Sequence, residues 1–398
     1  MRSNKLLNFI NHNKWIIVFL LMIPFFNDGY VTFKIVEDWL MDSMKVFAFL
    51  SMIVLLLVKK KKISRLTICL IAIEIWWFIS TMLNYPLSES EVYYKLIIDN
   101  INAISVALIV ELFIDEPISL INGLILNMEL AIYPNLFTVL MLPKGSGYYL
   151  LGYYALFALW ILPSICIGFL YMYLNKKIVR GSLLIVACLI TSLWVWNATT
   201  IVALMALFGF LIFGTALKWL KNTKLPSWIF VCLVIILNVF VLFAYSGGNF
   251  PLIDFFIERI LHKSTTFTGR TEIWREAIRM IQEKPIIGHG FRPIVYATNE
   301  YGSEYLHCHN QLLQRLNATG IIGLLLFALF HIEAIYKIDQ SENSYERIVM
   351  IAGILGVCMT YITDAYKKFF RFYLIFFLAY YVNELVNEKI VNTKELIE

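Results

Sequence analysis

The sequence predicts an all-α integral membrane protein with about twelve transmembrane helices and one large extracytoplasmic loop. Of its 398 residues, 60% are hydrophobic, 16% aromatic and only 15% charged, and the mean hydropathy is +0.73. Apolar runs of about 17 to 25 residues recur, each long enough to cross a hydrocarbon core as a helix. Lysine and arginine gather in alternate loops, as in multi-pass membrane proteins. This composition excludes a soluble globule.

The apolar runs divide the chain into three parts. The predicted spans lie near residues 14–30, 44–58, 66–83, 96–114, 118–141, 153–174, 182–197, 199–217, 226–245, 310–331, 347–363 and 369–386. Residues 1–245 would hold spans one to nine, and residues 246–308 form the extracytoplasmic loop. Residues 309–398 would hold the last three spans and a cytoplasmic tail.

The distribution of positive charge predicts that both termini are cytoplasmic, because cytoplasmic loops carry the excess of lysine and arginine. Two segments on the predicted outer side are exceptions. The outer loop and the last outer turn hold these cations: Arg259, Lys263, Arg270, Arg275, Arg279, Lys284, Arg292, Lys367, Lys368 and Arg371. Long loops cross the membrane largely regardless of charge, so these cations indicate either an anionic ligand or a merely solvated loop.

One stretch of the outer loop has the pattern of an amphipathic helix. Between Gly269 and Glu283, apolar residues recur at helical spacing and charged residues occupy most other positions. Thr268 is a suitable N-cap, and Pro285 ends the helix by disfavouring helical geometry at the preceding residue. We expect this helix to lie along the outer membrane interface with Trp274 anchored in it; the alternative is a lid that packs on the bundle.

The loop returns to the membrane through a glycine-flanked turn, I-I-G-H-G, which ends at Gly290. After a polar stretch, His309 and Asn310 stand at the mouth of the next span. His309 would therefore be held at the first turn of a rigid element. That is the depth at which the headgroup of a lipid-linked substrate lies.

These motifs carry a family resemblance. In order, they are T-G-R-T-E-I-W from Thr268, E-K-P-I-I-G-H-G from Glu283, H-N-Q-L-L from His309, and the glycines Gly320 and Gly323. Their order, spacing and place before the tenth span resemble the superfamily of O-antigen ligases and polymerases. These are bacterial membrane glycosyltransferases that make or transfer surface polysaccharide, and the resemblance implies a GT-C-like fold.

The resemblance also implies roles for particular residues. Arg270 matches the family arginine that contacts the diphosphate of a polyprenyl-linked glycan, and His309 matches the family histidine that acts on the acceptor. Asn310, beside it, is assigned to substrate binding. A second family arginine has no counterpart between Trp196 and Thr200. Either the alignment differs there, or the diphosphate is bound by other cations, which are Arg292, Arg315 and the cluster Lys367, Lys368 and Arg371.

The chemistry of these two residues fits that assignment. A guanidinium can neutralise a leaving diphosphate with two hydrogen bonds and without a metal ion. Histidine is the usual general base for a hydroxyl whose proton leaves as the bond forms. We therefore expect metal-independent transfer, without a cofactor, by a single displacement that inverts the anomeric carbon.

Other ionisable residues offer alternatives. His307, His262 and His289 also lie in the loop, and in a helical start His307 and His309 would point to different faces. A metal site built from His307, Cys308 and His309 is disfavoured, because adjacent ligands span a tetrahedral site poorly. Within the spans, Glu74 and Glu129 either face a groove or are neutral and hydrogen-bonded between helices, which we favour, and Glu111 is expected to reach water at the cytoplasmic edge.

The sequence thus predicts a polymerase that joins polyprenyl-diphosphate-linked repeat units of an O-antigen or capsule type of polysaccharide. It would lie in the bacterial plasma membrane with its active site on the outer face. Its partners would be the lipid-linked donor and acceptor, the bilayer, and a flippase and a chain-length regulator, with no nucleic acid. Two alternatives stay open: a ligase that moves a finished glycan to another acceptor, and a flippase or transporter.

Overall fold

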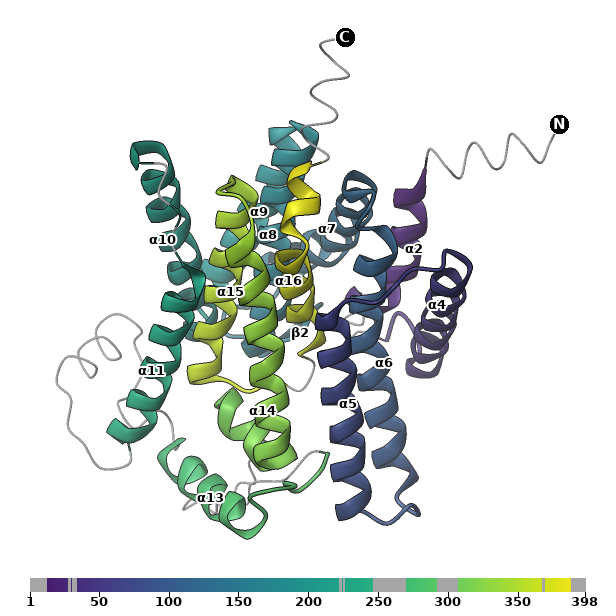
Figure 1. Ribbon diagram of the computed structural model, residues 1–398, viewed down its shortest axis with the longest axis vertical. Helices are drawn as coiled ribbons and strands as arrows, with labels where there is room; N and C mark the ends of the chain where they lie inside the picture. Colours follow the sequence, from purple (N-terminus) through teal and green to yellow (C-terminus); the bar gives the residue numbers. More distant parts are fainter. Residues whose placement is uncertain are drawn as a thin grey trace.

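The computed structural model describes residues 13–27, 30, 34–221, 224, 226–245, 270–291, 307–366 and 369–387. This part of the chain is a bundle of helices with one two-stranded hairpin (Figure 1). The helices are α2 (Lys14–Phe26), α4 (Asp38–Val58), α5 (Arg65–Asn84), α6 (Ser90–Phe113), α7 (Pro117–Met141), α8 (Ala158–Asn175), α9 (Ile178–Val195), α10 (Ala198–Lys221), α11 (Ser227–Tyr245), α13 (Arg270–Glu283), α14 (Gln311–Gln340), α15 (Tyr345–Thr363) and α16 (Phe370–Tyr380). The strands β1 (Tyr148–Tyr149) and β2 (Gly152–Tyr153) pair antiparallel before a 3-10 turn (Tyr154–Leu156).

The all-α membrane class is confirmed. Among the described residues, nine helices are long and apolar enough to cross a membrane, and three shorter apolar helices are α2, α11 and α16. Each predicted span coincides with one of these twelve in chain order, although the number that cross the bilayer stays a prediction. The largest difference is α14, which continues to Gln340, nine residues past the predicted end at 331. Its last turns carry Glu333 and Lys337. These charged residues end the apolar run, but they do not end a helix, because glutamate and lysine both favour helical structure.

Local signals explain several helix ends, because the first N–H groups of a helix need partners from outside it. The Ser64 hydroxyl accepts a bond from Thr67 N at the start of α5, and the Ser344 hydroxyl accepts one from Arg347 N at the start of α15. Pro117 opens α7, where its missing N–H is harmless. Almost all of α15 is buried, so it forms the centre around which α8, α10, α11 and α16 pack.

The two ends of the bundle hold different segments of the chain. One end, here called the α13 end, holds α13, the start of α14, the turn between α5 and α6, and the residues after α15 (Figure 1). The opposite end holds the start of α2, where Lys14 pairs with Glu116 at 2.5 Å, and the last described helical residues, 382–387. The first and last described segments therefore lie at the end away from α13.

The helix α14 is broken at Gly320, whose φ of 63° and ψ of −169° are open essentially to glycine alone. The break frees backbone groups that the segment 285–291 then binds. His289 N donates to Asn317 O, Gly290 N donates to Ala318 O, and Ile321 N donates to Pro285 O, at 2.8, 2.8 and 2.9 Å. The I-I-G-H-G turn therefore runs alongside α14, and its irregular backbone is satisfied by the protein.

The helix α5 completes this junction with three side chains. The Ser80 hydroxyl donates to Ile287 O at 2.6 Å, and the Trp76 indole donates to Thr319 O at 2.8 Å. The Asn84 amide donates to Gly288 O at 3.0 Å. The segment 285–291 is thus fixed between α5 and α14, which in turn fixes the C-terminal end of α13.

Two predictions about buried carboxylates need correction. Glu111 does not reach water: it is 2% exposed and accepts hydrogen bonds from Thr67 Oγ1 and Tyr381 Oη, each at 2.5 Å. Glu129 is hydrogen-bonded between helices, as predicted, but its partner is a cation: Arg180 on α9 donates to both of its oxygens at 2.7 and 2.6 Å. In both cases a neighbour distant in sequence supplies the partner, which helical spacing alone cannot identify.

Candidate functional site

The candidate site is built on the head of α14, which Asn310 caps. The Asn310 side-chain oxygen accepts bonds from Leu312 N and Leu313 N, both at 3.1 Å. Its amide donates to Asn238 Oδ1 on α11 at 2.9 Å and to Ile362 O on α15 at 3.4 Å. Asn310 is fully buried, so these bonds leave none of its side chain at the surface for the predicted substrate contact. Its observed role is to join three helices directly beside His309.

His309 and His307 face each other, contrary to the expectation that they point to different faces. Their ring centroids are 4.0 Å apart with an interplanar angle of 61°. That expectation assumed helical geometry, whereas α14 begins only at Gln311 and His309 has a φ of 47°. A left-handed residue is uncommon outside glycine, although histidine tolerates it better than most. The turn at His309 brings the two side chains to the same side.

Asp364, which was not predicted as a site residue from the sequence, completes this group. It follows α15 directly, and its Oδ1 lies 3.7 Å from Nδ1 of His309. The Asp364 side chain is only 8% exposed, whereas that of His309 is 29% exposed. One signal was available in the sequence, because a single acidic residue at the end of an apolar span is a candidate functional group.

The three side chains together, here called the His–His–Asp cluster (His307, His309, Asp364), could also hold a metal ion. Each offers one ligand atom, and these atoms lie within 4.8 Å of one another. The disfavoured set with Cys308 is not formed. Cys308 is fully buried, Asn317 Nδ2 lies 3.8 Å from its sulfur, and burial raises the pKa of its thiol to about 12.

The helix α13 packs on the bundle, as in the lid alternative. Trp274 is 4% exposed, and its indole donates to Cys308 O at 2.9 Å. Ile273 and Ala277 are fully buried in the same cluster, with Leu313 of α14 and Ile362 of α15. The expectation that Trp274 anchors in the membrane interface is therefore wrong, because its polar tip binds protein instead of water or headgroups.

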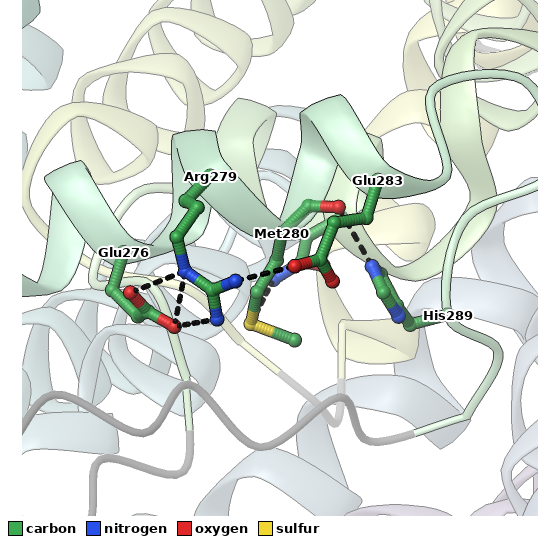
Figure 2. Close-up of polar contacts among 6 residues, drawn as sticks. Glu276, Arg279, Met280, Glu283 and His289 are labelled. Carbon is green, nitrogen blue, oxygen red and sulfur yellow. Dashed lines mark hydrogen bonds and ion pairs between the residues drawn. The ribbon is translucent and has the colours of Figure 1, made fainter.

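The outer face of α13 carries charges that bind each other (Figure 2). Arg279 donates to Glu276 at 2.6 Å and also pairs with Glu283. The hydrogen bonds from Arg279 lower the pKa of Glu276 and raise that of Arg279, so this patch stays ionised. On the other side, a ring nitrogen of His289 lies 2.7 Å from Met280 O, which makes His289 part of the α13 junction (Figure 2).

The predicted cations differ in whether the structure describes their side chains. Arg270 is the first residue of α13, and the structure describes its backbone but not its side chain. Several other predicted residues lie outside the described part of the chain: Thr268, His262, Arg292, Lys367 and Lys368.

Arg315 and Arg371 are buried inside the bundle. Arg315 is 4% exposed, and its guanidinium lies 5.1, 5.0 and 5.7 Å from the rings of Trp77, Phe327 and Phe369. Arg371 is fully buried, 4.0 Å from the ring of Trp160. These are cation–π contacts within the protein. A diphosphate at the surface would not reach either residue in this conformation.

An apolar cavity begins near this site and runs along the bundle between α11 and α14, with a volume of about 790 Å³. Asn238, the partner of Asn310, lines one end, and Lys224 and Asp339 line the other. Between Ser227, where α11 begins, and Asn238, 11 residues of helical rise correspond to about 17 Å. Apart from the pair His331 and Tyr361, the lining between the ends is almost wholly apolar.

The bundle of apolar helices defines a multi-pass membrane protein, and the His–His–Asp cluster at one end is its candidate site. Residues 183–328, from the second turn of α9 to the middle of α14, match the sequence model of the family described as O-Antigen ligase. The match covers 146 of the 398 residues and confirms the predicted resemblance. It contains His309 and the segment 285–291, whereas Asp364 lies after it.

A curated relative supports the same placement. The chain is 24% identical over 189 residues to the exopolysaccharide production protein ExoQ of Rhizobium meliloti (strain 1021). The match covers 44% of this chain and 41% of that protein, which is less than half of its length. The two comparisons together show that the chain is similar to a family described as O-Antigen ligase and to a protein described by exopolysaccharide production.

Proposed function

We propose that this protein is a membrane glycosyltransferase that moves a glycan from a polyprenyl diphosphate to a second glycan. The observation that carries the proposal is the approach of Asp364 to His309 at the head of α14, at 3.7 Å, with His309 inside the region that matches the O-antigen ligase family. A partly exposed imidazole beside a buried carboxylate is a common arrangement for a general base.

The proposed reaction is one displacement. The acceptor hydroxyl oxygen attacks the anomeric carbon of the donor and forms the new glycosidic bond. The bond from that carbon to the diphosphate oxygen breaks, and its electron pair leaves with the diphosphate. The hydroxyl proton passes to Nε2 of His309, while Asp364 orients the ring through the proton on Nδ1. A separation of 3.7 Å is long for that hydrogen bond, and such contacts often shorten when the substrate binds.

Arg270 is proposed to bind the diphosphate, although its side chain lies outside the described part. Arg270 and Trp274 are four residues apart on α13 and therefore share a face of the helix. Trp274 donates to Cys308 O, next to His309 in sequence. This register supports the proposal, because Arg270 shares a helix face with the residue that binds beside the head of α14, and a guanidinium there can neutralise the leaving group.

The apolar cavity between α11 and α14 is proposed to hold the polyprenyl chain of a substrate. It starts beside Asn238, which binds Asn310, so the diphosphate of a lipid lying there would be close to the cluster. In this arrangement the α13 end of the bundle faces outside the cell in the plasma membrane, as the charge distribution predicts.

Polymerisation is the preferred form of the reaction, because the relative ExoQ is described as an exopolysaccharide production protein. Ligation to a different acceptor is the second candidate, because the matching family is described by that activity. Transport is not favoured. Two of the charged groups that the structure describes inside the bundle bind other protein groups: Arg347 donates to Asp339 at 3.0 Å, and Glu111 accepts from Thr67 and Tyr381.

The test uses a deletion strain that expresses the wild type or a variant at matched level. Wild type should restore high-molecular-weight polymer. His309→Ala should reduce it by about 100-fold or more, because a general base typically contributes that much. Arg270→Ala should reduce it by about 100-fold or more, because loss of one group that stabilises developing negative charge costs that much. His289→Gln is the matched control, since His289 lies at the same end but binds Met280 O. Polymer formation by His309→Ala at normal level would contradict the proposal.

Asp364 is tested as a positioning residue with purified protein. Asp364→Asn should lower kcat by about 100-fold with little change in KM, and Asp364→Glu should recover part of the loss. Equal losses in Asp364→Asn and Asp364→Glu, with a raised KM, would point to a structural role. The lipid-linked glycans of the deletion strain separate the two reactions, because single repeat units accumulate without a polymerase and long polymer accumulates without a ligase.

A further inference from the structure

We propose that the His–His–Asp cluster binds one divalent transition-metal ion of the Zn²⁺ type. The ligand atoms of His307, His309 and Asp364 lie within 4.8 Å of one another. Two imidazoles and one carboxylate form a ligand set that Zn²⁺ uses in sites where three protein ligands leave a fourth position for water. Mg²⁺ and Ca²⁺ prefer sets made of oxygen atoms, so neither fits this cluster.

The distances need only a small adjustment. With metal–nitrogen and metal–oxygen bonds of about 2.0 to 2.2 Å, ligand atoms of a tetrahedral site are about 3.3 Å apart. His309 Nδ1 and Asp364 Oδ1 are already 3.7 Å apart. The imidazole of His307 faces that of His309 at a centroid distance of 4.0 Å. Rotation about the side-chain bonds of His307 can therefore close the cluster around an ion.

The backbone holds two of the three ligands in place. Asn310 joins α14 to α11 and α15, and so fixes the position of the residue before it, His309. His309 keeps a φ of 47° although it is not glycine. Strained residues of this kind occur at active sites and ligand clamps, where the surrounding structure maintains them. Asp364 is fixed at the end of the buried helix α15.

His307 and His309 are partly exposed, whereas Asp364 is buried. Cys308, between the two histidines, does not compete for the ion, because it is fully buried under Trp274. An ion would bind His309 at Nδ1, the atom beside Asp364, whereas the acceptor hydroxyl would approach Nε2.

This position has a consequence that rests on the proposed function. An ion in the cluster would bind His309 and Asp364 themselves, so metal binding and glycosyl transfer exclude each other. The cluster is then an inhibitory metal site, and transfer proceeds in the metal-free protein.

Binding is tested first, without any activity assay. The full-length protein, purified in detergent and treated with a chelator, is titrated with Zn²⁺ and with Co²⁺, whose visible absorption reports tetrahedral coordination. Wild type should bind one ion per chain. His307→Asn and Asp364→Asn should weaken binding by at least about 100-fold, since loss of a supporting residue alone costs 10- to 100-fold. His289→Asn, a histidine at the same end, should bind as wild type does.

Thermal unfolding guards against misfolded variants. Zn²⁺ should raise the unfolding temperature of wild type and of His289→Asn but not that of His307→Asn, while the three metal-free proteins unfold at similar temperatures. Absence of saturable binding, or equal binding by His307→Asn and His289→Asn, would overturn the metal site.

Transfer assays separate the two proposals. Zn²⁺ should inhibit wild type at the concentrations that saturate binding, and a chelator should restore activity. Full transfer by metal-saturated protein would refute the inhibitory role. Stoichiometric metal binding by a protein that transfers no glycan, with every donor and acceptor tested, would overturn the proposed function and leave the metal site standing.

Discussion

Replacing Gly320 by alanine tests whether the junction between α14 and the segment 285–291 holds the site together. At a φ of 63° and ψ of −169°, an L side chain is strained. A Cβ atom there would lie 2.1 Å from Ile286 O and 2.3 Å from Ile286 C, which is backbone and cannot turn aside. The segment 285–291 must then move away from α14.

The expected loss of stability follows from these contacts. The strained backbone costs about 1 to 3 kcal/mol. Moving the segment breaks the bonds from His289 N to Asn317 O and from Gly290 N to Ala318 O. Each buried group left without a partner costs about 1 to 3 kcal/mol. The sum predicts that Gly320→Ala lowers the free energy of unfolding by about 3 to 9 kcal/mol.

The assay is equilibrium unfolding in mixed micelles, followed by tryptophan fluorescence, with two matched glycine controls. Gly145 also has a positive φ, 88°, but no atom within 4 Å, so Gly145→Ala isolates strain and should cost about 1 to 2 kcal/mol. Gly209 in α10 has neither strain nor a neighbour, so Gly209→Ala should be neutral or stabilising. If Gly320→Ala unfolds within 1 kcal/mol of Gly145→Ala, the argument for the junction is wrong.

Three further predictions concern other contacts. Trp274→Phe keeps an aromatic ring but leaves Cys308 O without its donor, so the free energy of unfolding should fall by about 1 to 3 kcal/mol. Protease should then cut α13 more readily. Unchanged digestion would contradict the packing of α13 through this bond. Burial raises the pKa of Cys308 to about 12, so its thiolate is scarce below that pH. Maleimide should therefore label Cys308 slowly at pH 8 in the folded protein but rapidly after unfolding. Equal labelling rates would show that the thiol is accessible. Glu129→Gln should lower the free energy of unfolding by about 1 to 2 kcal/mol, because Arg180 loses a bidentate partner. An unchanged free energy of unfolding would mean that this ion pair is dispensable.

The sequence was sufficient wherever the property depends on neighbours along the chain. Each apolar run became a helix, because a run of that length must satisfy its backbone within itself in lipid. The amphipathic stretch became α13, which ends at Glu283, two residues before Pro285. The motif around His309 also led to the family, because order and spacing are properties of the chain itself.

The sequence could not show which elements contact each other in the folded protein. The same apolar face of α13 could meet lipid or protein, and the burial of Ile273 and Ala277 together with the bond from Trp274 to Cys308 O shows that it meets protein. The apolar pattern gave the span of α5 but not its three side-chain bonds to the 285–291 junction.

The class of protein, the helices of its apolar runs and the position of His309 just before α14 were thus determined by the sequence itself, since helix length in lipid and local motifs depend on contiguous residues. The tertiary structure alone decided that Asp364, 55 residues after His309, lies 3.7 Å from it. It also decided that His307 turns to the same side, through the left-handed backbone at His309. The physical reason is that a site made from the ends of two helices exists only once α14 and α15 have packed, and no spacing along the chain encodes that contact.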